Sequence, residues 1–194
     1  MDLKKIPAAR ILLIVIFGAM LFAGCASRST TLTNGELNHS VVIDNVPFFA
    51  QNRYQCGPAS LAGILNFFGD KVSPEEISDA IYRKDIRGTV SLDIVLFARK
   101  RGFHSRWYTG SIDDIHQTIS AGIPLLVMVD KGVGFLKSYH FMVITGFSPD
   151  GIIVNSGKSR HQIIPNRLFL YQWEKTQFWS LLVSPEAPME EQAG

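Results

Sequence analysis

Cys56 has the most evident reactive potential in this sequence. It precedes Gly57-Pro58 and an apolar-periodic run that stops at Gly69, a pattern that predicts a helix beginning at the cysteine. Unpaired N–H groups and the dipole at a helix N-terminus stabilise an anion, and the thiolate is the nucleophilic form of cysteine. The alternative is a buried, unreactive thiol, because free cysteines are often buried. The position favours a nucleophile.

Two other side chains could complete acyl-transfer chemistry with Cys56. Gln51 lies five residues upstream, where its side-chain amide could join the Cys56 backbone N–H in binding an oxyanion. His140 opens the otherwise apolar segment 140–146, and a histidine there could act as the base. The alternatives are an ordinary loop residue for Gln51 and a structural histidine for His140. Three other histidines have polar surroundings typical of solvated side chains: His39, His104 and His116.

Asn155 is the candidate for a third residue, one that would orient the imidazole of His140. It ends the next strand-like segment, after the turn-rich sequence GFSPDG. A four-residue loop over 146–149 would place Asn155 opposite His140 and in contact with it, whereas a tighter turn over 148–151 would place it opposite Ile144. Both registers keep the two side chains on one face. The alternative is that Asn155-Ser156-Gly157 is merely a turn.

Helices dominate the first half of the predicted domain, and strands dominate the second half. After the helix at Cys56, capping residues Ser73, Ser91 and Ser111 predict helices that run to about residues 82, 100 and 122. Aliphatic runs then predict strands over 125–129, 140–145, 152–155 and 179–183. This order predicts an α+β fold with a mostly antiparallel sheet. The sheet would present His140 across a cleft from Cys56.

Together these motifs resemble the bacteriocin-processing branch of papain-like cysteine peptidases, which removes double-glycine leader peptides. The resemblance rests on Gln51 with Cys56-Gly57-Pro58-Ala59-Ser60-Leu61, and on Tyr139-His140-Phe141 with the strands that follow. It implies a papain-like fold, with a helical half packed on an antiparallel sheet. It also implies four roles: Gln51 as oxyanion residue, Cys56 as nucleophile, His140 as base and Asn155 as orienter. The chain departs from the family at Asn155-Ser156, where Asp-Pro is usual, and at Gln55, where Asp is common.

The N-terminal residues resemble a bacterial lipoprotein signal. Lys4, Lys5 and Arg10 precede an apolar run over 11–23, which is shorter than the ~20 apolar residues of a membrane span. The run ends in Leu21-Phe22-Ala23-Gly24-Cys25, which is similar to a lipobox and implies cleavage before Cys25 and a lipid on its sulfur. Ordinary secretion or an uncleaved anchor is the alternative. We therefore expect a signal peptide over 1–24, lipidated Cys25 and a tether over 25–38, a peptidase domain over 39–184 and a disordered tail over 185–194.

Composition and spacing argue against several other classes of protein. The formal charge of +2 arises within residues 1–24, so no basic surplus remains for nucleic acid. Gly157-Lys158-Ser159 ends like a phosphate-binding loop, but Ile152 stands where that pattern needs glycine. No His/Cys/Asp cluster has the spacing of metal ligands. We expect no cofactor, metal, nucleotide or nucleic-acid partner.

The sequence thus predicts a cysteine peptidase that hydrolyses an exported peptide or envelope protein through a Cys-His-Asn acyl-enzyme. A lipid on Cys25 would anchor it in the bacterial cell envelope. In a Gram-negative cell, Ala26 is compatible with the periplasmic face of the outer membrane. Two alternatives use the same fold or residues. One is a lipid-tethered peptide-binding module without turnover, which Asn155-Ser156 favours. The other is a different thiol acyl-transfer enzyme, an amidase or a crosslinking enzyme.

Overall fold

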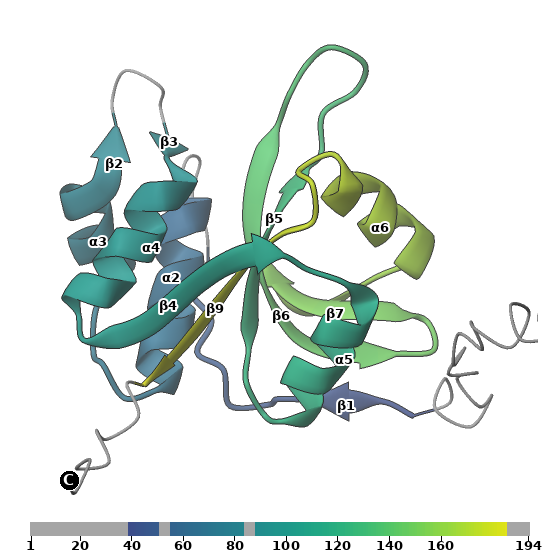
Figure 1. The fold of residues 1–194 in the computed structure, drawn as a ribbon, viewed down its shortest axis with the longest axis horizontal. Helices are drawn as coiled ribbons and strands as arrows, with labels where there is room; N and C mark the ends of the chain where they lie inside the picture. Colours follow the sequence, from purple (N-terminus) through teal and green to yellow (C-terminus); the bar gives the residue numbers. More distant parts are fainter. Residues whose placement is uncertain (1–38, 51–54, 84–87, 186–194) are drawn as a thin grey trace, which may run out of the picture. The chain divides into compact units, whose positions relative to one another are not determined.

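The computed structural model describes residues 39–50, 55–83 and 88–185 (Figure 1). The chain divides into two units, Met1–Glu36 and Leu37–Gly194, and the elements below belong to the second. The predicted signal peptide over 1–24, the lipidated Cys25 with its tether over 25–38, and Gln51 lie outside the described residues. The predicted tail over 185–194 does too, except for Pro185, which is the last residue of a strand.

The four helices predicted from the sequence are confirmed. They are α2 (Cys56–Phe67), α3 (Pro74–Ile81), α4 (Ser91–Lys100) and α5 (Ile112–Ser120). Ser73 and Ser111 cap α3 and α5, because their hydroxyl oxygens accept hydrogen bonds from backbone N–H groups in the first turn at 3.0 and 3.1 Å. Ser91 is the first residue of α4 instead of its cap. A further helix, α6 (Asn166–Glu174), has no counterpart in the prediction.

An antiparallel sheet carries most of the described strands. They lie in the order β4 (Phe103–Thr109), β9 (Trp179–Pro185), β5 (Leu125–Asp130), β6 (Tyr139–Ser148), β7 (Gly151–Ser156) and β8 (Ser159–Ile164). β1 (Val41–Val42) pairs with the second half of β6, and β2 (Tyr82–Arg83) forms a separate ribbon with β3 (Gly88–Thr89). The predicted α+β class with an antiparallel sheet is therefore confirmed.

The turn between β6 and β7 is the tighter of the two considered, but β6 contains an irregularity. Ser148 pairs with Gly151, and the register then shifts between Ile144 and Gly146, so that Thr145 is an extra residue in β6. The Thr145 carbonyl accepts a hydrogen bond from the Ile43 backbone N–H at 2.7 Å. The segment that follows β1 therefore stabilises this bulge.

Both predicted registers for Asn155 are wrong: the tighter turn excludes the pairing with His140, and the bulge excludes the pairing with Ile144. Asn155 pairs with Val143, and not with His140 or Ile144. A slip of one residue turns a side chain to the other face of a sheet. Asn155 consequently lies on the face of Val143, and the next residue, Ser156, takes the face of His140.

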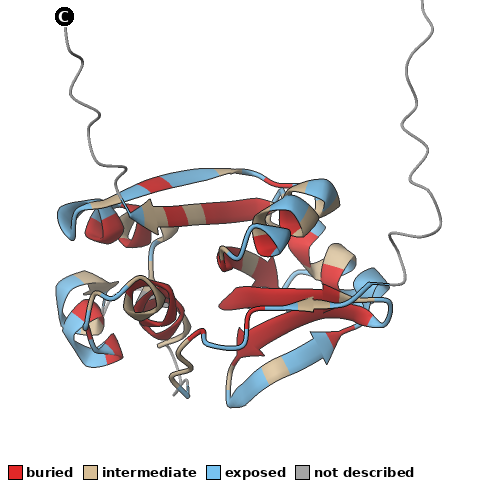
Figure 2. Cartoon of the chain, turned by 90° about the horizontal axis from the view of Figure 1, so that it is seen from below, coloured by how far each residue is buried: buried red, intermediate tan, exposed pale blue. Residues whose placement is uncertain are grey.

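A cluster of buried apolar side chains joins the helices to the sheet. Figure 2 shows buried residues along the strands and on the inner helix faces, whereas the outer helix faces are exposed. Residues 57–65 of α2 are all buried, because this helix contacts α3 and α4 as well as β5, β6 and β7. The packing fixes Cys56, at the start of α2, beside the sheet. Within the described ranges, no helix has the length and apolar character needed to cross a membrane.

Candidate active site

Cys56 is the first residue of α2, as predicted, and its free thiol is half-buried. The alternative, a buried and unreactive thiol, requires Cys56 to be sealed in the interior. The structure shows that it is not. The N-cap residue, Gln55, makes no side-chain cap hydrogen bond, so it leaves the first backbone N–H groups of α2 without that partner. These donors and the helix dipole can stabilise a thiolate or an oxyanion.

His140 is the second residue of β6, a strand that contacts α2. The beginnings of the two elements approach closely, because a methyl group on Gly57 would lie 3.4 Å from Phe141 Cδ2. Gly57 follows Cys56, and Phe141 follows His140. The two candidate catalytic residues therefore flank a close helix–strand contact.

Lys131, which follows β5, interacts electrostatically with both candidate catalytic residues. Burial lowers the pKa of the Lys131 ammonium, and the charge of a Cys56 thiolate raises it. Burial is also the larger cause that lowers the pKa of His140 to about 4, and the charge of Lys131 is the second cause. Cys56, Lys131 and His140 thus share one electrostatic environment. Burial and Lys131 keep the imidazole of His140 neutral, which is the form that can accept a proton.

Sequence analysis missed Lys131, although strand pairing could have found it. Val129 pairs with His140, and residues two apart in a strand leave the sheet on the same face. A prediction of the β5–β6 hairpin with its register would therefore have placed Lys131 beside His140.

Ser156 is the hydrogen-bond partner of the imidazole. His140 Nε2 lies 2.9 Å from Ser156 Oγ. Asn155 Oδ1 instead accepts a hydrogen bond from the backbone N–H of His161 at 3.0 Å, and Asn155 Nδ2 has no partner among the described residues. The contact between Asn155 and His140 that the longer loop predicts is therefore wrong, because the turn is the tighter one and the bulge at Thr145 turns Asn155 to the other face. Sequence analysis missed Ser156 because it placed Asn155, the preceding residue, on the face of the sheet that carries His140.

A comparison with protein-family models identifies the family of this chain. A model of the Peptidase_C39 like family matches residues 43–180, which include Cys56, Lys131, His140 and Ser156. The chain belongs to the Peptidase_C39 like family. No curated protein sequence matches it.

Solved structures support the same fold for this C39-like domain. A putative C39-like peptidase from Bacillus anthracis is 16% identical, with a TM-score of 0.64, and the match covers 78% of this chain and 100% of that one. The peptidase domain of Streptococcus ComA, a bifunctional ABC transporter involved in quorum sensing, is 23% identical, with a TM-score of 0.61 and coverage of 73% and 99%. A double glycine motif protease from an AMS/PCAT transporter, in complex with the leader peptide, is 21% identical, with a TM-score of 0.59 and coverage of 77% and 100%. At these identities the likeness establishes the fold.

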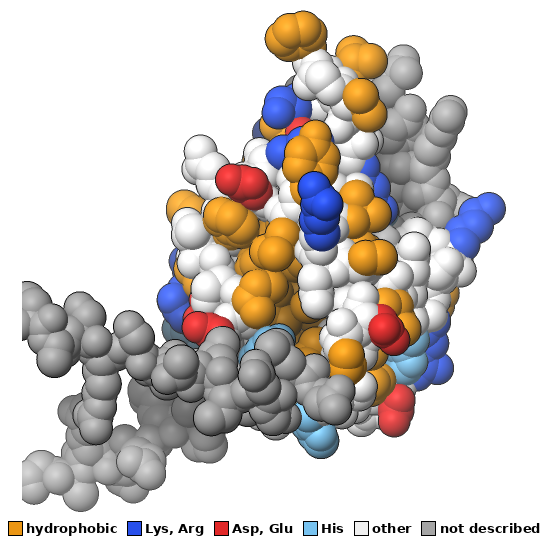
Figure 3. All heavy atoms as spheres, turned by 90° about the vertical axis from the view of Figure 1, so that its right-hand side faces the viewer, with side chains coloured by type: hydrophobic (Ala, Val, Ile, Leu, Met, Phe, Trp, Pro, Cys, Tyr) orange, Lys and Arg blue, Asp and Glu red, His pale blue; other side chains and the backbone are white. Residues whose placement is uncertain are grey.

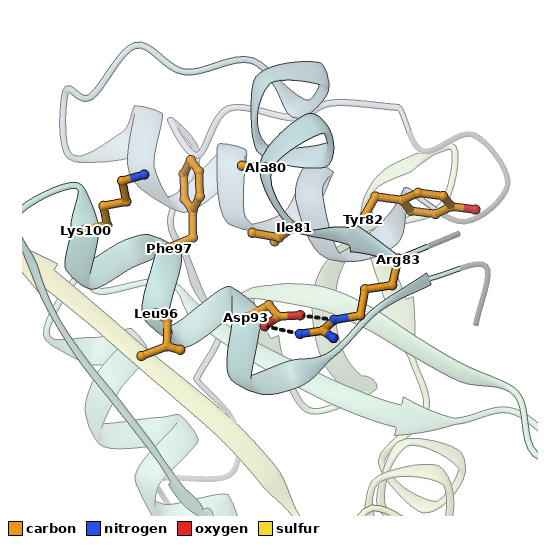
Figure 4. A pocket seen from close by; sticks show the side chains of 8 residues that line it. All are labelled: Ala80, Ile81, Tyr82, Arg83, Asp93, Leu96, Phe97 and Lys100. Atoms are coloured by element: carbon orange, nitrogen blue, oxygen red, sulfur yellow. Dashed lines mark hydrogen bonds and ion pairs between the residues drawn. The ribbon is translucent and has the colours of Figure 1, made fainter. Parts of the chain in front are cut away.

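One cavity of the C39-like domain lies among α3, β2 and α4, with a volume of about 360 Å³ (Figure 4). It contains an ion pair at 2.7 Å between Arg83 and Asp93. The remaining lining residues are Ala80, Ile81, Tyr82, Leu96, Phe97 and Lys100. Because neither Cys56 nor His140 lines this cavity, it is separate from the candidate active site.

A second cavity, of about 300 Å³, is lined by residues of α4, β4 and β9. Its lining residues are Ser91, Leu92, Val95, Trp107 and Trp179. The ring of Trp179 contacts Phe141 edge to face at 5.7 Å between centroids. An apolar recess therefore adjoins the residue that follows His140. Among the residues that the structure describes, no group of three or more His, Cys, Asp or Glu side chains could hold a metal.

Proposed function

We propose that this chain is a cysteine peptidase of the bacterial cell envelope that hydrolyses peptide bonds in an exported peptide or envelope protein. Cys56 is the nucleophile and His140 is the base. The observation that carries the proposal is the half-buried free thiol at the start of α2, next to the strand that begins with Tyr139-His140. Membership of a peptidase family supports the reaction class.

Proton transfer from Cys56 to His140 begins the proposed reaction. When Nε2–H of His140 donates to Ser156 Oγ, the lone pair on Nδ1 is available to accept the thiol proton. The ammonium of Lys131 interacts with the negative charge that forms on the sulfur. Burial and Lys131 hold the pKa of His140 near 4, and the negative charge that forms on sulfur in this step favours the imidazolium.

The thiolate sulfur then attacks the carbonyl carbon of the peptide bond. Backbone N–H groups at the start of α2, with the side-chain amide of Gln51, hold the oxyanion. Collapse of the intermediate breaks the C–N bond, and His140 gives its proton to the departing amine. A water molecule that loses its proton to His140 then hydrolyses the Cys56 thioester, which releases the acid and restores the thiol.

We assign the orienting role to Ser156 in place of Asn155. The Ser156 hydroxyl is buried and lies within hydrogen-bond distance of the His140 ring, whereas the Asn155 amide oxygen binds a backbone N–H on β8. A neutral hydroxyl can fix the ring and its tautomer. It stabilises an imidazolium less than a carboxylate would.

The proposed substrate and location rest on the N-terminus and on one relative. A solved protease of the same fold is in complex with a leader peptide, which supports a peptide substrate for this chain. Residues 21–25 resemble a lipobox, which supports attachment through Cys25 at the periplasmic face of the outer membrane in a Gram-negative cell. Loss of fatty-acid labelling in the Cys25→Ser protein would support this attachment, and retained labelling would contradict it.

Peptide cleavage by the full-length protein tests the proposed activity. We expect new peptide termini, detected by mass spectrometry on a peptide library, with the parent protein and with His104→Ala, whose histidine is exposed on β4. Cys56→Ala and His140→Ala should both abolish them. Cleavage that survives in Cys56→Ala refutes the nucleophile assignment, and new amide links in place of new termini identify a crosslinking enzyme.

Alkylation of Cys56 separates an enzyme from a binding module. A thiol activated by the helix start and Lys131 should react with iodoacetamide rapidly near neutral pH, and more slowly in Lys131→Met. A Cys56 that reacts only above pH ~8.5 would favour the binding module.

A further inference from the structure

The hairpin between β5 and β6 carries large apolar side chains in solvent. Val133, Phe135 and Leu136 are 82%, 103% and 79% exposed, and we call these three residues the apolar tip. Figure 1 shows that this hairpin extends beyond the neighbouring helices and strands, and Figure 3 shows hydrophobic side chains gathered at the same end of the domain. Single exposed apolar residues are ordinary, but a group of them marks an interaction site.

Hydrogen bonds at the neck of the hairpin hold the apolar tip away from the body of the domain. The buried carboxylate of Asp130 accepts hydrogen bonds from the backbone N–H groups of Gly132 and Ser138, both at 2.8 Å. The Lys131 N–H donates to the Ser138 carbonyl at 2.9 Å, and Lys175 Nζ donates to the Gly132 carbonyl at 2.8 Å. Because both sides of the neck are fixed, the tip does not fold back to bury its side chains.

Cationic and aromatic side chains accompany the apolar tip. Lys137 is 54% exposed while its ammonium lies 3.2 Å from Asp130, and the Lys175 ammonium is bonded to the neck. Tyr139, at the start of β6, is 56% exposed. Apolar side chains flanked by lysines and a tyrosine are typical of segments that enter the boundary between lipid headgroups and acyl chains.

The form of the tip favours a bilayer over a protein as its partner. Specific protein interfaces bury about 1,200–2,000 Å² over complementary surfaces. An aromatic side chain buries about 150–250 Å², so three side chains on a projecting turn supply little of such an interface. A lipid surface, by contrast, closes around a projection, and anionic headgroups complement the two lysines.

We propose that the apolar tip inserts into the surface of an anionic lipid bilayer, with Lys137 and Lys175 at the level of the headgroups. This inference does not depend on peptidase activity. Because Lys131 belongs to the same hairpin and interacts with Cys56 and His140, insertion places the candidate active site close to the membrane surface.

A fluorescent label beside the tip tests this proposal in the full-length chain. Cys25→Ser and Cys56→Ala remove the natural thiols, and Val133→Cys then carries an environment-sensitive NBD group, while Phe135 and Leu136 remain. The matched control carries the same label at Asp150→Cys, an exposed position in the turn between β6 and β7. The label reports insertion of the tip itself, however residues 1–38 associate with lipid.

We expect vesicles of phosphatidylcholine and phosphatidylglycerol to shift the emission of the label at 133 to shorter wavelength, and to leave the label at 150 unchanged. Replacing Phe135 and Leu136 by serine should abolish the shift. Omitting phosphatidylglycerol should raise the vesicle concentration at half-maximal shift by about fivefold, because Asp130 compensates the charge of Lys137 and that of Lys175 remains.

Three results would overturn the proposal. The first is a label at 133 that keeps its aqueous emission with vesicles, or a shift that survives the two serine substitutions. The second is a shift caused by a tryptic digest of casein without vesicles, which would identify a peptide-binding surface. The third is a shift that depends on protein concentration alone, which would identify contact with a second copy of the chain.

Discussion

Acidification should lower the free energy of unfolding of this domain, and the titration of His140 should account for part of that decrease. Burial and the charge of Lys131 lower the pKa of His140 from 6.5 to about 4. Between these values the unfolded chain binds a proton at this residue that the folded chain does not bind, so stability falls as the pH falls. Proton linkage with these two pKa values lowers the free energy of unfolding by about 2 kcal/mol between pH 7 and pH 5, and by about 3 kcal/mol between pH 7 and pH 4.

Urea unfolding, followed by tryptophan fluorescence at several pH values, measures the contribution of His140 to the pH dependence of stability. His140→Gln can still bond to Ser156 but cannot titrate, so its free energy of unfolding should fall less than that of the parent by about 2 kcal/mol between pH 7 and pH 5. His104→Gln, at an exposed position on β4, should follow the parent. Carboxyl groups are common to all three proteins and cancel in the comparison. Parallel profiles for His140→Gln and the parent would refute the reasoning.

Three further substitutions test other contacts. Ser156→Ala should lower kcat/KM by about 10- to 100-fold, because the His140 ring loses the bond that orients it. Asp130→Asn should destabilise the domain by about 1–3 kcal/mol in urea unfolding at pH 7. Hydrogen bonds hold the pKa of Asp130 low, so this difference should vanish as the pH falls through that pKa. Gly63→Ala should cost about 1–3 kcal/mol, because its Cβ would lie 2.8 Å from the Pro47 carbonyl oxygen.

Each of the three predictions for Ser156, Asp130 and Gly63 has an outcome that would contradict it. Asn155→Ala is the matched control for Ser156→Ala, and an equal fall in kcat/KM would contradict the assignment of the orienting role to Ser156. An Asp130→Asn protein as stable as the parent would show that the carboxylate charge is dispensable in the neck. For Gly63→Ala, unchanged stability would mean that α2 shifts away from Pro47 without cost.

Local signals in the sequence were sufficient for the helical half of the domain. Gly57-Pro58 predicts a helix start at Cys56, and hydroxyl caps at Ser73 and Ser111 predict α3 and α5. These features depend on residues within one or two turns of one another. The position of Cys56 at the start of α2 was therefore predictable.

Elements that depend on distant partners were not predictable from local pattern. β8 has mostly exposed side chains and is held by backbone pairing with β7, so it lacks an alternating apolar signal. In α6 the buried Phe169 and Trp173 share a short run with exposed Leu168 and Tyr171, which obscures the helical stripe. The bulge at Thr145 depends on a hydrogen bond from Ile43, about a hundred residues earlier in the chain. For that reason Ser156 was missed and Asn155 was placed on the wrong face.

The extra residue at Thr145 separates two ways in which a catalytic centre can change. Substitution alters the chemistry of a side chain at its position, whereas a change of strand register exchanges one cross-strand neighbour for the next. With the observed turn, a version of β6 that lacked the bulge would pair Asn155 with the residue at 144 and return its amide to the imidazole's side. The register of β6 therefore decides which of two adjacent side chains of β7 shares a face with His140, without any change at either position.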